Sequence, residues 1–485
     1  MTAPTEERAE VIATLFALQQ AFEELIVRGL ESTGPDDLTK LAALGDELGR
    51  AGAAYVPDLI GKLVHLVRER DDGAARALLY AQTASRVFER VVSLDAAAEM
   101  LAPGDVELPP LAAATATVAI APALAPVLDE LAELIEGLVD SGLTTATRAT
   151  LDKLGASFKE ASRLKLLRLA TSLRYVTDEC SRFLAESEHF SARRLAFFAN
   201  RTWLLARGMR DAIARGDRAA LARLVLAATP VPVKSLSVAV IGVQKRALLD
   251  GSAAFELRLR TLTDASGVAK GTRLVVSFVF GARKGVPAEA FLHLPQPQKF
   301  MPKTLLEPKQ FTITDAAVAL DDSGGGRLML GPKSTVTAGT AFDRHAELVA
   351  FDPARARARV LAHRISPLDL EIDLQEDVIV RDYELGPSAP NPHRTDQRVW
   401  PLRTGELELD ATASTGPDGA ELAAALDALR KAGDKPPLYG TVHYEMARLV
   451  FQPLTALTAK GPRHLMISSE KIDLAALMKT LDFTT

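Results

Sequence analysis

The spacing of apolar residues along the chain changes between residues 224 and 236. Before this stretch, apolar side chains recur every three or four positions, which is typical of amphipathic helices. After it they recur every second position, which is typical of strands with one buried face. Pro230 and Pro232 lie at the change. Because a proline fixes φ and lacks an amide donor, we expect no helix to cross this point.

This pattern predicts a multidomain protein with α and β parts, because 485 residues are too many for one hydrophobic core. Residues 1–229 are expected to form an irregular α-helical bundle. A proline joint at 230–234 is expected to lead into a β-rich domain at 235–485, which is sandwich- or barrel-like and carries a few short helices. A polar, proline-rich break at 386–393 is a possible point of subdivision within that domain.

The longest helix of the first half is predicted to lie within 147–187. Its apolar residues step by three and four without a miss: Leu166, Leu169, Leu173, Val176, Cys180 and Phe183. Such a seam is typical of the central helix of a bundle, although pairing with another chain is an alternative. Because Cys180 lies on the seam, we expect a buried thiol and not a nucleophile.

The β-rich half shows strand patterns separated by turn signals. Residues 311–320 and 327–337 are predicted to form a hairpin, and 345–351 a short strand. A second hairpin is predicted to turn at 446–447. For 354–363 two interpretations stay open: a helix that begins after an aspartate–proline pair, or a strand.

The clearest alternation of apolar and acidic residues covers 367–380 and predicts one strand with an acidic face. Asp369, Glu371 and Asp373 would lie on that face. Alternate carboxylates on a strand are about 6.5–7 Å apart, a separation compatible with paired-carboxylate hydrolysis or a hard cation. Neighbouring carboxylates on a sheet are also common without any function, and this is the interpretation we favour.

Residues 282–309 have five prolines and no regular apolar spacing. They are predicted to form a long accessible loop, and loops of this length are usually binding elements or mobile segments. Phe291 and Phe300 are therefore candidate contact residues. A merely flexible insert is the alternative.

Arginine and aromatic residues are interleaved over residues 188–223. Arg193, Arg194, Arg201 and Arg207 fall on one broad helical face. One interpretation is a basic groove for phosphate or an acidic partner, since arginine binds oxyanions in a bidentate way. The other is an aromatic core with a solvated arginine face, and it is the one we favour.

Charge and cysteine content narrow the class of protein. The formal net charge of −5 suggests no overall attraction to nucleic acid or anionic membranes. A single cysteine cannot form an internal disulfide, which fits a soluble protein of the reducing cytoplasm. The histidines of the β-rich half are scattered, at His293, His345, His363, His393, His443 and His464. We therefore expect no metal site and no cofactor.

One uncharged segment, 108–128, has roughly the length of a membrane span. It consists mainly of alanine and threonine with several prolines, and alanine gains little on transfer into lipid. An alanine-packed pair of helices is the preferred interpretation, and no membrane span is expected.

The leading functional hypothesis is a non-catalytic intracellular interaction or scaffold (adaptor) protein, with another protein as its partner. Its candidate binding residues are Arg193, Arg194, Arg201, Arg207, Phe291 and Phe300. One alternative is a hydrolase-type enzyme that uses carboxylates and histidines of the β-rich half, and its candidate residues are His345, Asp369, Asp373 and His443. The other is a nucleic-acid-binding protein that uses the arginine–aromatic stretch 188–223.

Overall fold

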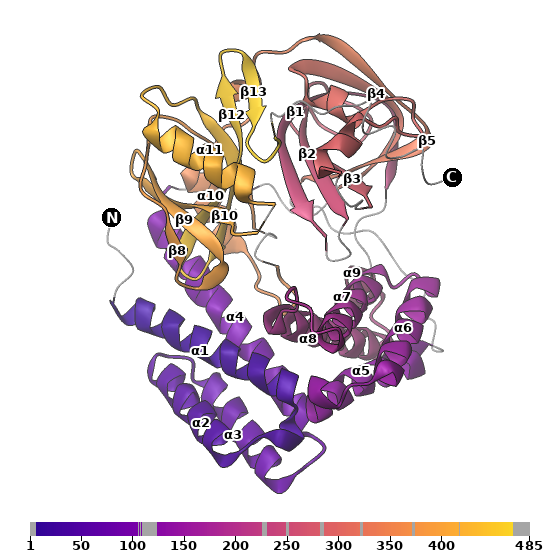
Figure 1. Cartoon of the computed structure of the whole chain (residues 1–485), viewed down its shortest axis with the longest axis vertical. Helices are drawn as coiled ribbons and strands as arrows, with labels where there is room; N and C mark the ends of the chain where they lie inside the picture. Colours follow the sequence, from indigo (N-terminus) through magenta and orange to yellow (C-terminus); the bar gives the residue numbers. More distant parts are fainter. Residues whose placement is uncertain are drawn as a thin grey trace. The chain divides into compact units, whose positions relative to one another are not determined.

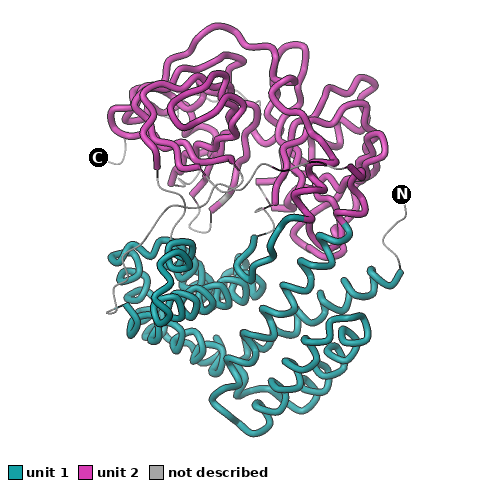
Figure 2. The backbone as a smooth tube through the Cα atoms, turned by 180° about the vertical axis from the view of Figure 1, so that it is seen from behind, with its two compact units in different colours: residues 1–96, 114–227, 362–373 teal, residues 97–113, 228–361, 374–485 magenta. Residues whose placement is uncertain are grey.

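The computed structural model describes residues 6–104, 106, 108, 124–225, 230–248, 252–281, 286–320, 324–370, 374–416 and 418–468. The N-terminal part is helical and the C-terminal part is β-rich, which confirms the predicted fold class (Figure 1). The chain divides into two compact units (Figure 2). The first, here called the helical unit, comprises 1–96, 114–227 and 362–373, and the second, the β-rich unit, comprises 97–113, 228–361 and 374–485.

The helices before residue 226 are α1 (Glu6–Arg28), α2 (Pro35–Arg50), α3 (Tyr55–Glu69), α4 (Ala74–Met100), α5 (Leu124–Ser141), α6 (Arg148–Arg163), α7 (Leu167–Leu184), α8 (Ala192–Ala214) and α9 (Arg218–Val225). Helix α8 packs against α5 and α7. Its Trp203, Leu205 and Met209 are fully buried, as the apolar spacing of this stretch requires. Among the described residues, no helix combines the length and the apolar character that crossing a membrane demands. Residues 109–123 of the uncharged segment lie outside the described part.

The predicted long helix within 147–187 is wrong, because α6 and α7 are separate helices. Lys165 has a left-handed backbone with φ of 59°. The amide of Leu166 bonds to the carbonyl of Ala161, and that of Lys165 to the carbonyl of Ser162. This is a Schellman end formed without glycine, so the sequence gives no warning of it. The longest described helix is α4, with 27 residues.

A closed five-stranded barrel follows the helices. Its strands are β1 (Val231–Ala247), β2 (Ala253–Thr261), β3 (Arg273–Phe280), β4 (Lys309–Leu320) and β5 (Gly326–Ala341), joined in the order β1-β2-β3-β5-β4. Strands β3 and β5 are parallel, and the other pairs are antiparallel. Residues 231–234, expected to form a joint, are the start of β1, where Pro232 pairs with Ala317. A proline is tolerated at the start of a strand because only one amide donor is lost there.

The segment between β3 and β4 contributes to the barrel core. It forms two short 3-10 helices, η3 (Ala288–His293) and η4 (Pro302–Leu306). Leu292, Phe300 and Leu305 belong to the same buried cluster as the inward side chains of the strands. The predicted accessible loop is therefore wrong where the segment carries these three residues, whereas Lys299 and Lys303 of the same segment are exposed. Short 3-10 turns have no long apolar period, so isolated apolar residues can fill a barrel without a recognisable pattern.

The other sheet has the strand order β6-β11-β12-β10-β9-β7, with β13 beside β12 and β8 beside β9. The bounds are β6 (Glu376–Val380), β7 (Tyr383–Leu385), β8 (Ala389–Asn391), β9 (Arg394–Thr404), β10 (Leu407–Ser414), β11 (Leu438–Glu445), β12 (Arg448–Thr458) and β13 (Gly461–His464). The predicted hairpin is confirmed, since β11 and β12 are antiparallel and joined at Met446 and Ala447. Both turn residues have positive φ, 48° and 54°.

Three further predictions concern this part of the chain. Residues 354–362 are helical, as part of α10 (Pro353–Ala362), and Asp352 Oδ1 accepts the amides of Ala354 and Arg355 at its start. The strand expected at 345–351 is wrong, because η5 (His345–Glu347) is a 3-10 helix. Of the strand expected over 367–380, only the part that forms β6 (Glu376–Val380) is confirmed. Helix α11 (Ala420–Lys431) lies between β10 and β11 in the chain.

Candidate anion site

The outer face of the barrel bears a line of charged residues on β2. Phe255, Leu257 and Leu259 point into the barrel core. Because side chains alternate along a strand, Glu256, Arg258 and Arg260 lie on the opposite face. The side chains of Arg258 and Arg260 are nonetheless only 7% and 10% exposed. Two guanidinium groups are therefore withdrawn from water on the outside of the barrel.

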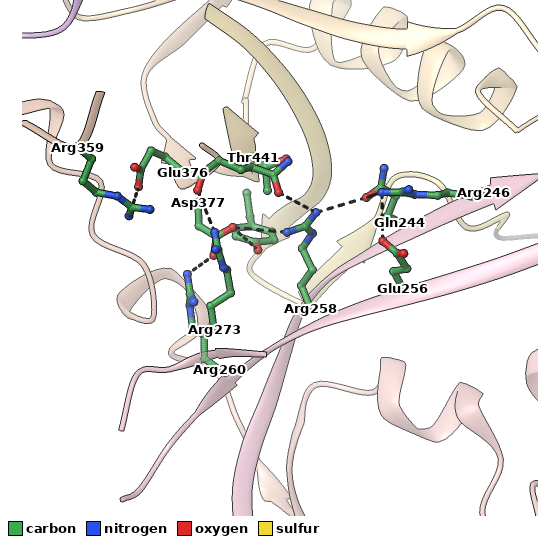
Figure 3. Close-up of polar contacts among 12 residues, drawn as sticks. Gln244, Arg246, Glu256, Arg258, Arg260, Arg273, Arg359, Glu376, Asp377 and Thr441 are labelled. Carbon is green, nitrogen blue, oxygen red and sulfur yellow. Dashed lines mark hydrogen bonds and ion pairs between the residues drawn. The ribbon is translucent and has the colours of Figure 1, made fainter. Parts of the chain in front are cut away.

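Both guanidinium groups meet the carboxylate of Asp377, which lies on β6 of the other sheet (Figure 3). Arg260 Nη2 is ion-paired with Asp377 Oδ2. Arg258 Nη1 lies 4.0 Å from Asp377 Oδ1. The hydroxyl of Tyr439 donates to the same Oδ1 at 3.2 Å. Asp377 is thus a single anion shared by two cations and a hydroxyl donor.

Neutral groups supply further contacts of this cluster. Arg258 Nη2 donates to Gln244 Oε1 at 3.4 Å and to Gln375 Oε1 at 3.3 Å. Arg273, on β3, donates from Nη1 to the carbonyl of Gln375 at 2.9 Å. The amide of Gln375 donates to Thr441 Oγ1 at 2.9 Å. These contacts fix the geometry of the guanidinium groups without neutralising their charge.

The two buried cations are not fully satisfied within the described residues. Arg258 Nε and Arg260 Nε are buried and have no hydrogen-bond acceptor there. Two guanidinium groups carry two positive charges, whereas the shared carboxylate carries one negative charge. Taking a charge out of water without a compensating partner costs on the order of several kcal/mol in folding free energy. The two guanidinium groups therefore share one carboxylate, and arginine pairs bind carboxylate and phosphate oxygens well.

Two ion pairs border the site (Figure 3). Arg246 Nη2 lies 3.3 Å from Glu256 Oε2, and the Arg246 side chain is 42% exposed. On the other side, Arg359 Nη1 lies 3.2 Å from Glu376 Oε2. Burial raises the pKa of Glu376, although Arg359 acts in the opposite direction. Burial and the neighbouring Asp377 also raise the pKa of Tyr439, so its hydroxyl stays a donor at neutral pH.

The arginines predicted from residues 188–223 are held by groups within the helical unit. Arg194 Nε donates to Glu179 Oε1 at 2.8 Å, and Glu179 is fully buried. Arg201 Nη1 donates to the carbonyl of Leu368 at 2.6 Å. Arg207 Nη2 donates to Glu136 Oε1 at 2.7 Å. Burial raises the pKa of Glu23 to about 7, although the nearby Arg193 acts in the opposite direction. Their predicted role in binding stays a prediction.

The predicted contact residues Phe291 and Phe300 belong to the β-rich unit and are 6% and 8% exposed. The ring of Phe291 stacks on Phe280, and the ring of Phe300 meets Phe278 edge to face. Packing in and around the barrel core accounts for both rings. Their burial does not fit the accessible loop on which the binding prediction was based.

The predicted carboxylates and histidines are distributed over both units. Asp369 belongs to the helical unit, where its Oδ2 lies 2.7 Å from His363 Nε2. His443 belongs to the β-rich unit, and its Nε2 lies 3.5 Å from Glu445 Oε2. His345 is buried, and burial lowers its pKa. Glu371 and Asp373 lie outside the described residues. Within the described part of the chain, no three His, Cys, Asp or Glu side chains form a metal-binding group.

Sequence reasoning did not single out Arg258, Arg260 and Asp377. The signal was partly available, because charged residues alternate with buried ones along 253–261. Such an alternation is normally read as a solvated face. The sequence does not indicate that a carboxylate 117 positions further along the chain lies against this face.

Comparisons with known proteins assign this chain to no family. No family model and no curated protein matches the sequence. Among solved structures, a chain described as "Structural mimicry for functional antagonism" is 10% identical, with 46% of this chain and 90% of that chain covered and a TM-score of 0.21. A similarity this weak carries no argument about fold or function. The function proposed below therefore depends on the geometry of the site.

Proposed function

We propose that the chain is a non-catalytic interaction protein of the cytoplasm, and that Arg258 and Arg260 bind an anionic group of its partner. The observation that carries this proposal is the sharing of one carboxylate, that of Asp377, by two buried guanidinium groups. The buried Nε donors of both arginines also have no hydrogen-bond acceptor among the described residues. The partner's group would be a carboxylate or a phosphate, because both offer paired oxygens to arginine.

The position of the arginines on the barrel supports this proposal by analogy. In five-stranded barrels of the OB type, the outer face of strands 2 and 3 is a usual ligand surface. Arg258 and Arg260 lie on β2, and Arg273 lies on β3. A fold-level analogy says nothing about which ligand binds, so the chemistry is taken from the arginines themselves.

Chemical rescue tests the proposal directly. Asp377→Asn removes the shared carboxylate, so the variant should unfold at a lower temperature than the wild type. Phosphate or acetate at constant ionic strength should restore part of that loss, because either anion can pair with the two guanidinium groups that the substituted side chain no longer neutralises. A larger rescue by phosphate would indicate a phosphorylated partner, and a larger rescue by acetate would indicate an acidic one. Melting temperature with chloride as the reference anion is the measurement.

Two matched variants separate a site from a general salt effect. Asp396→Asn removes an exposed carboxylate of the same unit, whose side chain is 69% exposed, and should show no rescue. The double variant Arg258→Gln, Arg260→Gln should lose the response to either anion, whereas Arg246→Gln should keep it. If phosphate and acetate stabilise every variant equally, the arginine pair is only structural and the proposal fails.

A second candidate, hydrolase-type chemistry, is favoured by the contact between His443 and Glu445. A carboxylate next to an imidazole can orient that imidazole as a general base. His443 Nδ1 is buried and has no partner among the described residues. Hydrolysis of activated esters by the wild type, lost in His443→Gln but kept in His293→Gln, would support this candidate. An inactive wild type would reject it.

A further inference from the structure

A cavity of about 360 Å³ that is open to solvent lies at the end of α7 in the helical unit. Its lining includes Leu143 and Thr144 from η2 (Leu143–Thr145), together with Phe183, Leu184, Glu186 and Phe190. This volume is in the range of small-ligand sites, which are mostly apolar with a few convergent polar groups. Two phenylalanines and one acidic residue in the lining match that description.

The end of α7 explains how the rings come together. The amide of Ser187 bonds to the carbonyl of Arg182, and that of Glu186 to the carbonyl of Phe183. Glu186 takes a left-handed backbone with φ of 50°, which completes a Schellman turn. The chain then reverses, and Phe190 meets Phe183 with ring centroids 5.3 Å apart and planes at 66°. One wall of the cavity is therefore aromatic.

The electrostatic character of the cavity favours a cation. Glu186, an acidic residue, is among those that line it, and it is exposed to solvent. The C-terminal ends of α5 and α7, each 18 residues long, immediately precede lining residues. A helix C-terminus carries roughly half a negative charge. The basic residue in the last turn of α7, Arg182, is paired with the buried Glu179 at 2.8 Å.

We propose that this cavity binds a protonated amine carried on an apolar body. The faces of Phe183 and Phe190 would contact the apolar part and attract the ammonium group, since aromatic rings bind cations through their quadrupole. Glu186 would provide the opposite charge. This site is independent of the arginine pair, because it belongs to the helical unit and selects the opposite sign of charge.

Ligand-observed fluorine NMR with the full chain tests the inference. The probe is 4-fluorophenethylamine, and the comparators are 2-(4-fluorophenyl)ethanol, which is neutral, and 4-fluorophenylacetate, which is anionic. We expect the amine to bind about tenfold more tightly than the alcohol, from cation–π and charge attraction together. The acetate should bind more weakly than the alcohol.

Glu186→Gln should reduce the affinity for the amine to that for the alcohol, while the affinity for the alcohol is unchanged. Glu188→Gln is the matched control, because that side chain is 88% exposed and does not line the cavity. Phe190→Leu should weaken the binding of both ligands. Equal affinity for amine and alcohol in the wild type overturns the inference. So does an equal effect of Glu186→Gln and Glu188→Gln, or the absence of any binding at millimolar amine.

Discussion

Gly242 lies directly against the ring of Tyr439. A Cβ built on this glycine would come within 2.5 Å of Tyr439 Cε1 and 2.9 Å of Cδ1. Gly242 is on β1 of the barrel and Tyr439 is on β11 of the other sheet. The close approach lets the fully buried tyrosine reach Asp377 with its hydroxyl. The glycine is thus a steric requirement of the candidate anion site.

Gly242→Ala should therefore destabilise the protein by about 1–3 kcal/mol, because a buried aromatic ring must move to admit the methyl group. Urea unfolding followed by circular dichroism is the measurement. Gly281→Ala is the control, since a Cβ there meets no atom within 4 Å, and its effect should stay within about 0.5 kcal/mol. Equal effects of the two substitutions would show that the contact with Tyr439 is not close.

Asp377→Asn should cost about 3 kcal/mol in the free energy of unfolding, because it leaves two buried guanidinium groups without their carboxylate. Denaturant titration in chloride buffer measures this loss before any rescuing anion is added. Asp396→Asn, at an exposed ion pair with Arg394, should cost less than about 1 kcal/mol. A small effect of Asp377→Asn would mean that water already solvates these arginines.

Arg194→Ala should lower stability by roughly 1–3 kcal/mol, because Arg194 compensates the fully buried carboxylate of Glu179. Arg148→Ala, whose side chain is 85% exposed and pairs with Asp152 at 3.5 Å, is the matched control and should change stability by less than about 0.5 kcal/mol. Thermal unfolding of both variants is the measurement. If Arg194→Ala changes stability as little as the control does, Arg182 alone compensates the charge of Glu179. Arg194 could then bind a partner without loss of stability.

Acid should remove a contribution that Glu445 makes to stability. Burial acts to raise the pKa of Glu445, but His443, Arg394 and Arg448 together lower it to about 2. Because the folded-state pKa lies below the unfolded value of about 4.3, the stabilisation is complete above that value and is lost as pH falls toward 2. Wild type should exceed Glu445→Gln in stability at pH 6, and the difference should shrink steadily between pH 4.5 and pH 2.5. A constant difference over that range contradicts the lowered pKa.

The order of helical and β-rich parts could be predicted because apolar spacing is a local property. The hairpin at 446–447 was predictable for the same reason, since its signals lie within a few residues. For α10 the sequence left a helix and a strand open, and the structure has the helix. The break at Lys165 was not, because a left-handed residue without glycine leaves no mark in the sequence. The interior position of Phe300 and the partnership of Arg260 with Asp377 depend on long-range packing. Residue spacing carries no information about such contacts.

The helical unit takes in residues 362–373, which follow β1–β5 in the chain. Arg201 in α8 links the helices to this segment, because the acceptor of its hydrogen bond is the carbonyl of Leu368. During synthesis, the helices up to α9 are made before this segment, which follows more than a hundred residues later. At ribosomal rates this interval is about 7–30 s, long compared with the folding of a helix bundle. A ribosome-bound chain stalled just before residue 362 would hold a helical unit that still lacks one of its parts.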